Sequence, residues 1–94
     1  MAERKQYDPR IIKVGQLLTH TRKSLGPGYR SRESFIRNRS NELFGGSDWI
    51  SPRHLANLEE GKNLPSLEKL IQLADALEID PVDLFREILR ILRT

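Results

Sequence analysis

The chain has 94 residues and a formal net charge of +3, with 37% hydrophobic residues and no cysteine. This length suffices for one domain with a modest core, and the absence of cysteine excludes disulfides and thiolate metal sites. The chain contains neither a signal-peptide pattern near its start nor an apolar run of the roughly 20 residues that cross a bilayer, so we expect a cytoplasmic protein without a membrane partner.

A first helix is predicted over residues 8–25. Asp8 can cap this helix and Pro9 suits its first turn. The apolar residues that follow recur at helical spacing: Ile11, Val14, Leu17, Leu18 and Leu25. Gly26 is the expected stop, and the stretch GPGYRS is predicted to form a loop.

A second helix is predicted over residues 31–42, with Phe35 and Ile36 facing inward. The glycine pair in NELFGGSDW would cost a helix interior about 1 kcal/mol for each glycine, so residues 43–50 are predicted to form a loop. We expect Phe44 and Trp49 to pin this loop to the core.

Each of the last three helices is predicted to open at a capping residue. Ser51 and Pro52 begin the third helix and Gly61 ends it, while Ser66 and Asp80 cap the fourth and the fifth. The predicted ranges are 51–60, 66–77 and 80–93. The sequence therefore predicts an all-α domain of five helices over residues 1–94.

Three stretches, VGQLLTHTRKSLG, SRESFI and ISPRHLANLEEGKNLPSLEKLIQLADALEIDPVDLF, resemble the Xre/Cro-like, lambda-repressor-like helix-turn-helix family. The resemblance covers residues 14–85 and is most specific from Ile50 onward. There a helix ends in Glu-x-Gly-Lys, Pro-Ser precedes the next helix, and Asp-x-x-x-Leu-Phe follows. The resemblance implies a DNA-binding fold whose third helix is the recognition helix.

The segment between the second and third helices departs from the family pattern. The family has a tight turn there, whereas thirteen residues, RNRSNELFGGSDW, separate Ile36 from Ile50. One interpretation is an insertion after a longer second helix, and the other is a second helix that starts at Ser40. The second register would place Gly45 and Gly46 inside a helix, so we favour the insertion.

The start of the third helix carries the candidate base readers. Leu55 and Leu58 must face the core, and the outward positions that remain are Pro52, Arg53, Ala56 and Asn57. Arginine can offer two donors to guanine, asparagine can bind adenine with two hydrogen bonds, and alanine can touch a thymine methyl group. The resemblance implies the same positions as readers of double-stranded DNA.

Candidate phosphate contacts lie around the helix starts: Arg30, Ser31, Arg32, Ser51 and Lys62, with Arg37 and Arg39 in support. The resemblance implies phosphate contact at the first turn of the second helix, whose N–H groups suit anions. Residues 1–63 contain twelve Lys and Arg against seven Asp and Glu, whereas residues 64–94 contain four against six. This asymmetry favours an anionic partner on the N-terminal side.

The fifth helix offers more apolar surface than one small core needs, through Ile88, Leu89, Ile91 and Leu92. This surface either forms a homodimer interface or packs across the first helix, and both interpretations remain open. A dimer would place two recognition helices on a palindromic operator.

The sequence contains no pattern typical of an enzyme. His20 and His54 have no further ligand to complete a metal site, and FGGS is not followed by the Lys-Ser/Thr of a phosphate-binding loop. We expect no catalytic site, no cofactor and no metal. The leading hypothesis is a DNA-binding transcriptional repressor, and the alternative is an antitoxin-like or adaptor module that binds a protein partner through the fifth helix and the inserted loop.

Overall fold

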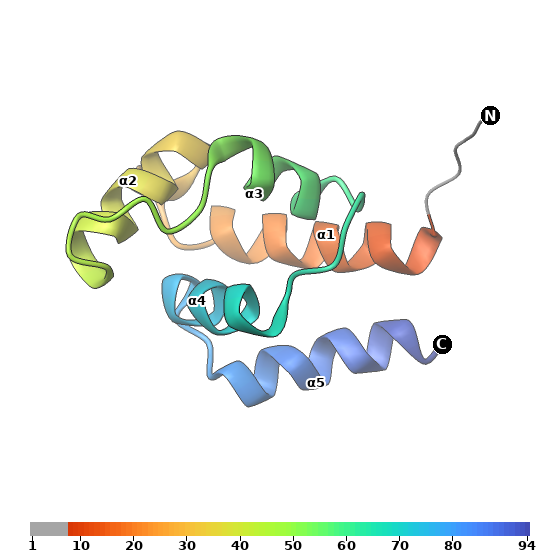
Figure 1. The fold of residues 1–94 in the computed structure, drawn as a ribbon. Helices are drawn as coiled ribbons and strands as arrows, with labels where there is room; N and C mark the ends of the chain where they lie inside the picture. Colours follow the sequence, from red (N-terminus) through yellow and green to blue (C-terminus); the bar gives the residue numbers. More distant parts are fainter. Residues whose placement is uncertain (1–7) are drawn as a thin grey trace.

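The computed structural model describes residues 8–94, which form five α-helices and one short 3-10 helix joined by loops (Figure 1). The elements are α1 (Pro9–Lys23), η1 (Pro27–Tyr29), α2 (Arg32–Leu43), α3 (Pro52–Glu59), α4 (Leu67–Leu77) and α5 (Pro81–Leu92). The described residues contain no strand, which confirms the all-α, five-helix fold. The expected domain of residues 1–94 begins with seven residues that lie outside this description.

Every α-helix begins after a residue whose side chain accepts a hydrogen bond from a backbone N–H of the first turn. These residues are Asp8, Ser31, Ser51, Ser66 and Asp80. Proline follows three of them, at the helix position where its missing N–H is not needed. The helix starts are therefore determined locally, by the residues at the caps.

The end of α1 differs from the prediction. The helix ends at Lys23 with Ser24 as its C-cap, so Leu25 lies beyond it rather than on its apolar face. Gly26 then reverses the chain with φ = 127°, and η1 forms within the stretch predicted as a loop.

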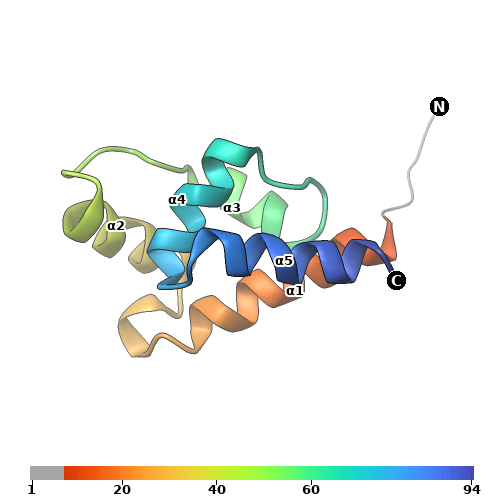
Figure 2. The ribbon, with the colours of Figure 1, turned by 90° about the horizontal axis from the view of Figure 1, so that it is seen from below.

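The helix α1 packs against α3 and α5, while α2 contacts α3 and α4, and α4 packs on α5 (Figures 1 and 2). Two glycines allow α1 and the α3 segment to approach backbone to backbone. A Cβ on Gly15 would lie 2.3 Å from the carbonyl oxygen of Glu59, and one on Gly61 would lie 2.5 Å from the Cα of Ile12. Gly61 also has φ = 78°, a conformation that glycine adopts without strain.

The inserted loop, residues 44–51, is anchored to the core. Trp49 is 4% exposed, stacks on Phe44 at a ring-centroid distance of 4.7 Å and meets Phe35 edge-on at 5.9 Å. Its Nε1 donates to the carbonyl oxygen of Ile36 at 3.1 Å. Phe44 and Trp49 thus pin the loop as predicted. Because α2 runs without a break to Leu43, the register with a second helix starting at Ser40 is wrong.

The packing of α5 corrects one prediction. Ile88 is only 4% exposed and belongs to the core, while Ile91 and Leu92 are partly buried against it. Ile88 is therefore not available as a dimer contact, because α5 packs on both α1 and α4 and this stripe of the helix fills the core. Leu89 is half-buried.

Different apolar side chains remain exposed on α4, α5 and the loop before α4. They are Leu64, Leu67, Ile71, Val82 and Phe85, which we call the apolar patch. A cavity of about 90 Å³ is lined by three of these residues, Leu64, Leu67 and Phe85, together with buried residues of α4 and α5. None of the described helices is both long and apolar enough to span a bilayer.

Candidate nucleic-acid interface

The first turn of α3 points away from the core. Leu55 and Leu58 are buried as predicted, and Pro52, Arg53 and His54 are exposed. The Arg53 side chain forms no hydrogen bond or ion pair with the residues that the structure describes. No other described residue thus occupies the donors of its guanidinium group.

Ala56 and Asn57, the other two predicted base readers, lie one turn further along and are half-buried. The Asn57 carbonyl oxygen accepts a hydrogen bond from the Lys62 backbone N–H at 2.9 Å, which fixes the chain as it leaves α3. A partner has to approach α3 closely to touch Ala56 or Asn57, whereas Arg53 extends outward.

The start of α2 lies beside α3 and carries the first predicted phosphate contacts. Arg30 and Ser31 are exposed. The Ser31 Oγ accepts from the Ser34 backbone N–H at 3.1 Å and caps the helix. Ser51 has the same role at α3, where its Oγ accepts from the His54 N–H at 3.0 Å. Both serines thus position a helix N-terminus, whatever further contacts their hydroxyl groups make.

A buried ion-pair network joins α1, α2 and α3. The Arg22 Nε donates to Glu59 Oε2 at 2.7 Å and its Nη2 donates to Oε1 at 2.9 Å, with both side chains at most 3% exposed. Arg32 also donates from Nε to Glu59 Oε1, at 2.7 Å. Burial alone would raise the pKa of Glu59, but the hydrogen bonds from Arg22 and Arg32 outweigh it and hold that pKa below its ordinary value.

The same network extends to the chain before α2. The Arg22 Nη1 donates to the carbonyl oxygens of Tyr29 and Arg30. One carboxylate on α3 thus fixes the start of α2 through Arg32 and, through Arg22, the segment that carries Arg30. Arg32, predicted only as a phosphate contact, is held by Glu59 and is one-third exposed.

Lys62 follows α3 and is exposed, as a phosphate contact requires. Its Nζ lies 3.2 Å from Glu60 Oε1, while the other oxygen of Glu60 lies 3.8 Å from Arg32 Nη1. Two of the predicted phosphate contacts therefore share one exposed carboxylate as counter-ion.

Arg39, named as a supporting phosphate contact, has a structural position instead. It is 6% exposed, its Nε donates to the Ala76 carbonyl oxygen at 2.8 Å, and its guanidinium lies 4.4 Å from the centre of the Tyr29 ring. It also pairs with Glu42 and Glu78, at 2.9 and 2.6 Å. The expectation for Arg39 is wrong because the side chain lies along the α2–α4 contact and joins the two helices.

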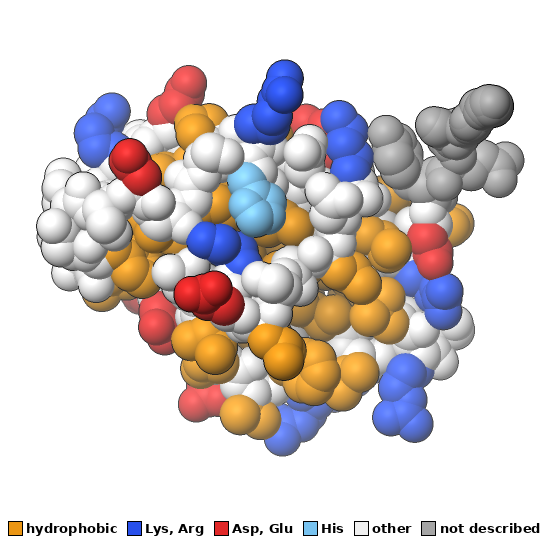
Figure 3. All heavy atoms as spheres, viewed as in Figure 1, with side chains coloured by type: hydrophobic (Ala, Val, Ile, Leu, Met, Phe, Trp, Pro, Cys, Tyr) orange, Lys and Arg blue, Asp and Glu red, His pale blue; other side chains and the backbone are white. Residues whose placement is uncertain are grey.

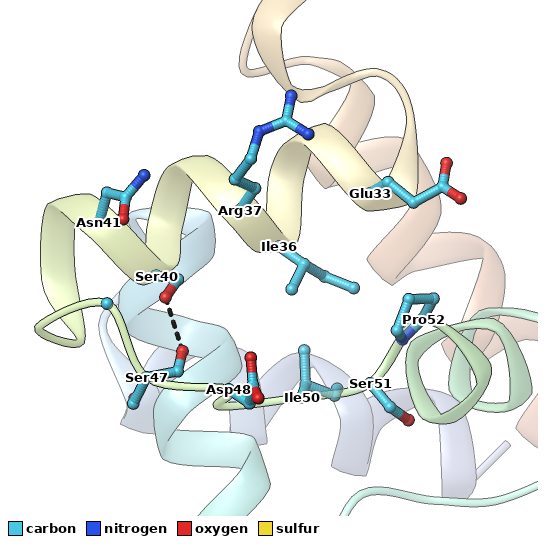
Figure 4. A pocket seen from close by; sticks show the side chains of 11 residues that line it. Glu33, Ile36, Arg37, Ser40, Asn41, Ser47, Asp48, Ile50, Ser51 and Pro52 are labelled. Atoms are coloured by element: carbon cyan, nitrogen blue, oxygen red, sulfur yellow. Dashed lines mark hydrogen bonds between the residues drawn. The ribbon is translucent and has the colours of Figure 1, made fainter.

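A groove of about 570 Å³ separates α2 from the inserted loop and reaches Pro52 at the start of α3 (Figure 4). Ile36 and Ile50 face each other across it, and the Ser40 Oγ donates to the Ser47 carbonyl oxygen at 2.6 Å, which closes the end farther from α3. Glu33, Arg37 and Asp48 are exposed at its edge. One feature of the sequence points to this groove, the length of the segment between Ile36 and Ile50.

Charge and hydrophobicity are distributed unequally over the surface. In Figure 3, Lys and Arg side chains project along the edge formed by α2, α3 and the loop after α3, with Asp and Glu side chains among them, and further Lys and Arg side chains project near α5. Hydrophobic side chains gather over α4 and α5. Among the described residues, no group of three His, Asp or Glu side chains could hold a metal ion. The exposed cations Arg30, Arg53 and Lys62 and the one-third exposed Arg32 lie at the start of α2, on α3 and in the loop after it, and we call this surface the basic face. The apolar patch lies on another part of the molecule.

Comparison with protein-family models gives a match to the family described as helix-turn-helix over residues 37–84. The matched segment is just over half of the chain. It begins within α2, includes all of α3 and α4, and ends in α5. Neither the curated proteins nor the solved structures contain a match to this chain.

Proposed function

The chain belongs to the lambda-repressor-like helix-turn-helix family of DNA-binding, non-enzymatic domains, and from this premise we propose that it is a sequence-specific transcriptional repressor. The observation that carries the proposal is the exposed first turn of α3, where Arg53 has no partner among the described residues. A helix of this kind fits the major groove of B-DNA, which is about 12 Å wide.

Base readout is assigned to Pro52, Arg53, Ala56 and Asn57. In this proposal Arg53 binds guanine O6 and N7 through two donors, and Asn57 binds adenine N6 and N7 once α3 lies deep in the groove. Pro52 and Ala56 present small apolar surfaces that suit a thymine methyl group. Because Ala56 and Asn57 are half-buried, these contacts require the α3 backbone to approach the base edges closely.

Phosphate contacts are assigned to both sides of α3. Arg30 and Ser31 lie before it in the chain, at the start of α2, and Lys62 follows it. Ser51 adds a hydroxyl group at the α3 N-terminus, and Arg32 reaches the surface while it holds Glu59. Such contacts position the protein on the duplex and do not themselves read sequence.

We assign the dimer contact to the apolar patch, with the half-buried Leu89, Ile91 and Leu92 at the edge of α5. Monomeric proteins rarely expose large contiguous apolar patches. Burial of the apolar patch against a second copy would gain about 25 cal/mol for each Å² of apolar surface. Leu67 is 71% exposed and Val82 is 61% exposed, so most of their apolar surface is available for burial in a dimer. A two-fold dimer would bind a palindromic operator whose half-sites lie about 34 Å apart.

Selection of bound sequences from a random DNA pool tests the DNA-binding proposal. With the selected site in hand, Arg53→Ala and Asn57→Ala are each expected to weaken binding by about 1–3 kcal/mol and to leave binding to random DNA nearly unchanged. Arg86→Ala is the matched control, because Arg86 is exposed on α5 and, among residues 8–94, pairs with Asp83 alone, at 3.0 Å. Equal losses on selected and random DNA would contradict base readout, and absence of any bound sequence would contradict the function.

Sedimentation tests the dimer. The unmodified chain is expected to dimerise at micromolar concentration, and Leu67→Lys with Phe85→Lys is expected to give a folded monomer with weaker operator binding. A monomeric wild-type chain that still binds one half-site selectively would contradict the dimer and leave the DNA-binding proposal intact.

A second function is an adaptor or antitoxin-like module, in which the groove beside the inserted loop and α5 bind another protein. The groove of about 570 Å³ favours this alternative, because its acidic side chains Glu33 and Asp48 are unsuited to a DNA phosphate. An adaptor would bind DNA weakly and without selectivity and would form a stable complex with a protein partner, so the same selection experiment separates the two functions.

A further inference from the structure

Glu60 places a negative charge within the basic face. This residue is the C-cap of α3, and its side chain is 47% exposed. Its two carboxylate oxygens point to different cations, with Oε1 at 3.2 Å from Lys62 Nζ and Oε2 at 3.8 Å from Arg32 Nη1. The carboxylate thus bridges two of the groups to which phosphate contact has been assigned.

The stability of the fold does not account for this carboxylate. A negative charge at a helix C-terminus opposes the helix dipole, and the last turn of α3 contains no basic residue to offset it. Exposed ion pairs contribute little to stability. Glu59, the preceding residue, differs in every respect, since its side chain is 1% exposed and its two arginine partners hold three helices together.

We propose that Glu60 is an internal counter-ion that occupies the position of a DNA phosphate between Arg32 and Lys62 and so limits sequence-independent binding. A phosphate oxygen pairs with the same cationic groups that form ion pairs with this carboxylate. The inference rests on the proposed DNA-binding function and goes beyond it, because it gives an acidic residue of the interface a role in setting affinity.

The effect on binding follows from charge. In the free protein Arg32 and Lys62 are already partly neutralised, so a phosphate must displace Glu60 or approach with the carboxylate nearby. Both routes reduce the gain from each backbone contact on any sequence, whereas the contacts of Arg53 to base edges do not involve Glu60. Fewer net phosphate charges are neutralised on binding, which lowers the salt dependence of affinity.

The experiment compares Glu60→Gln with wild type on a random-sequence duplex of 20 base pairs, by fluorescence anisotropy at several salt concentrations. Glu60→Gln removes the charge and keeps the shape. We expect about 3- to 10-fold tighter binding at low salt, since the variant removes a like charge a few ångströms from a phosphate, and a log–log salt slope that is steeper by up to about one unit. Thermal unfolding by circular dichroism checks that the variant folds as the wild type does.

Glu87→Gln is the matched control. It changes the net charge by the same amount, but Glu87 lies on α5 and pairs with Arg90 at 2.7 Å. Figures 1 and 2 place α5 and α3 on opposite sides of the molecule. The control is expected to change affinity less than Glu60→Gln at every salt concentration, and by less than about twofold near 0.1 M salt, where the Debye length is about 10 Å and more distant charges are largely screened.

A double-mutant cycle localises the effect. In a Lys62→Gln background the gain from Glu60→Gln should shrink, because one of the two cations that Glu60 neutralises is gone. Equal affinities of Glu60→Gln and Glu87→Gln would overturn the inference while leaving the DNA-binding function standing. If no variant binds any duplex at low salt, the proposed function itself fails and the inference fails with it.

Discussion

Replacement of Glu59 by glutamine tests the buried network that positions the recognition helix. The substitution keeps the side-chain shape but removes the charge that faces Arg22 and Arg32 at 2.7 Å each. Arg22 is 3% exposed in its side chain, so its guanidinium would remain buried without a counter-ion. Removal of one partner of a buried pair costs about 3–5 kcal/mol.

The lower end of this range applies here. Arg22 retains its hydrogen bonds to the Tyr29 and Arg30 carbonyl oxygens, and Arg32 is one-third exposed and can turn to solvent. We therefore expect a loss of about 3 kcal/mol in the free energy of unfolding. For a domain of this size, that corresponds to a fall in Tm of about 12–24 °C.

Urea unfolding gives the measurement, followed by circular dichroism and by the fluorescence of Trp49, the chain's single tryptophan. Glu60→Gln is the control, because it makes the same chemical change one residue away at an exposed position and should alter stability by less than about 0.5 kcal/mol. A loss below 1 kcal/mol for Glu59→Gln would refute the assignment of Glu59 as the residue that joins the three helices.

The remaining predictions concern acid stability, helix approach and capping. The pKa of Glu59 is lowered in the folded protein, so the ionised carboxylate contributes its full stabilisation above the ordinary pKa of 4.5, and this stabilisation is lost as the pH falls through the folded pKa. Urea titrations of the wild type between pH 7 and 3 should show this loss of stability. In Glu59→Gln the share of the loss that comes from Glu59 should be absent. Gly15→Ala should lower the Tm of the protein strongly in thermal melts, because the added Cβ would lie 2.3 Å from a backbone atom of Glu59. Gly28→Ala should be tolerated, because there the nearest atom is a side-chain nitrogen at 3.6 Å. Ser66→Ala should cost about 1 kcal/mol through the lost cap of α4, with Ser24→Ala, outside any helix start, as a near-neutral comparison in the same melts.

Local signals in the sequence were sufficient for the helices and for the exposed turn of α3. A capping side chain and a following proline act on the residues next to them, so Ser51 and Pro52 indicate the start of α3 without knowledge of the fold. The alternation of Leu55 and Leu58 with polar residues likewise determines which face of α3 is buried.

The ion pairs were not predictable in the same way. Arg22 and Glu59 are 37 positions apart, and nothing in the periodicity of either helix distinguishes them from solvated charges. Arg39 was assigned to the surface for this reason, although it contacts Ala76 and Glu78 across the α2–α4 boundary. Ion pairs between residues far apart in the sequence depend on how the helices are placed relative to one another. The pattern of residues along a single helix carries no information about that placement.

Ile88 was named as a dimer contact for a related reason. The sequence of α5 does not distinguish its buried apolar residues from its exposed ones, and only the presence of α1 on one side and α4 on the other decides that Ile88 is buried while Phe85 is 42% exposed. The sequence correctly indicated a surplus of apolar surface, but the structure locates much of it on α4, at Leu67 and Ile71.

The two glycine contacts limit how the recognition helix can move. At Gly15 and Gly61 the backbone of α1 lies directly against the chain at the end of α3, with no side chain between them to change rotamer. A tilt of α3 would therefore have to carry α1 with it, and α1 in turn is packed against α5. A duplex bound to such a rigid template would have to supply the adjustment itself, so its ease of bending and groove widening would contribute to selectivity at base pairs that no side chain touches.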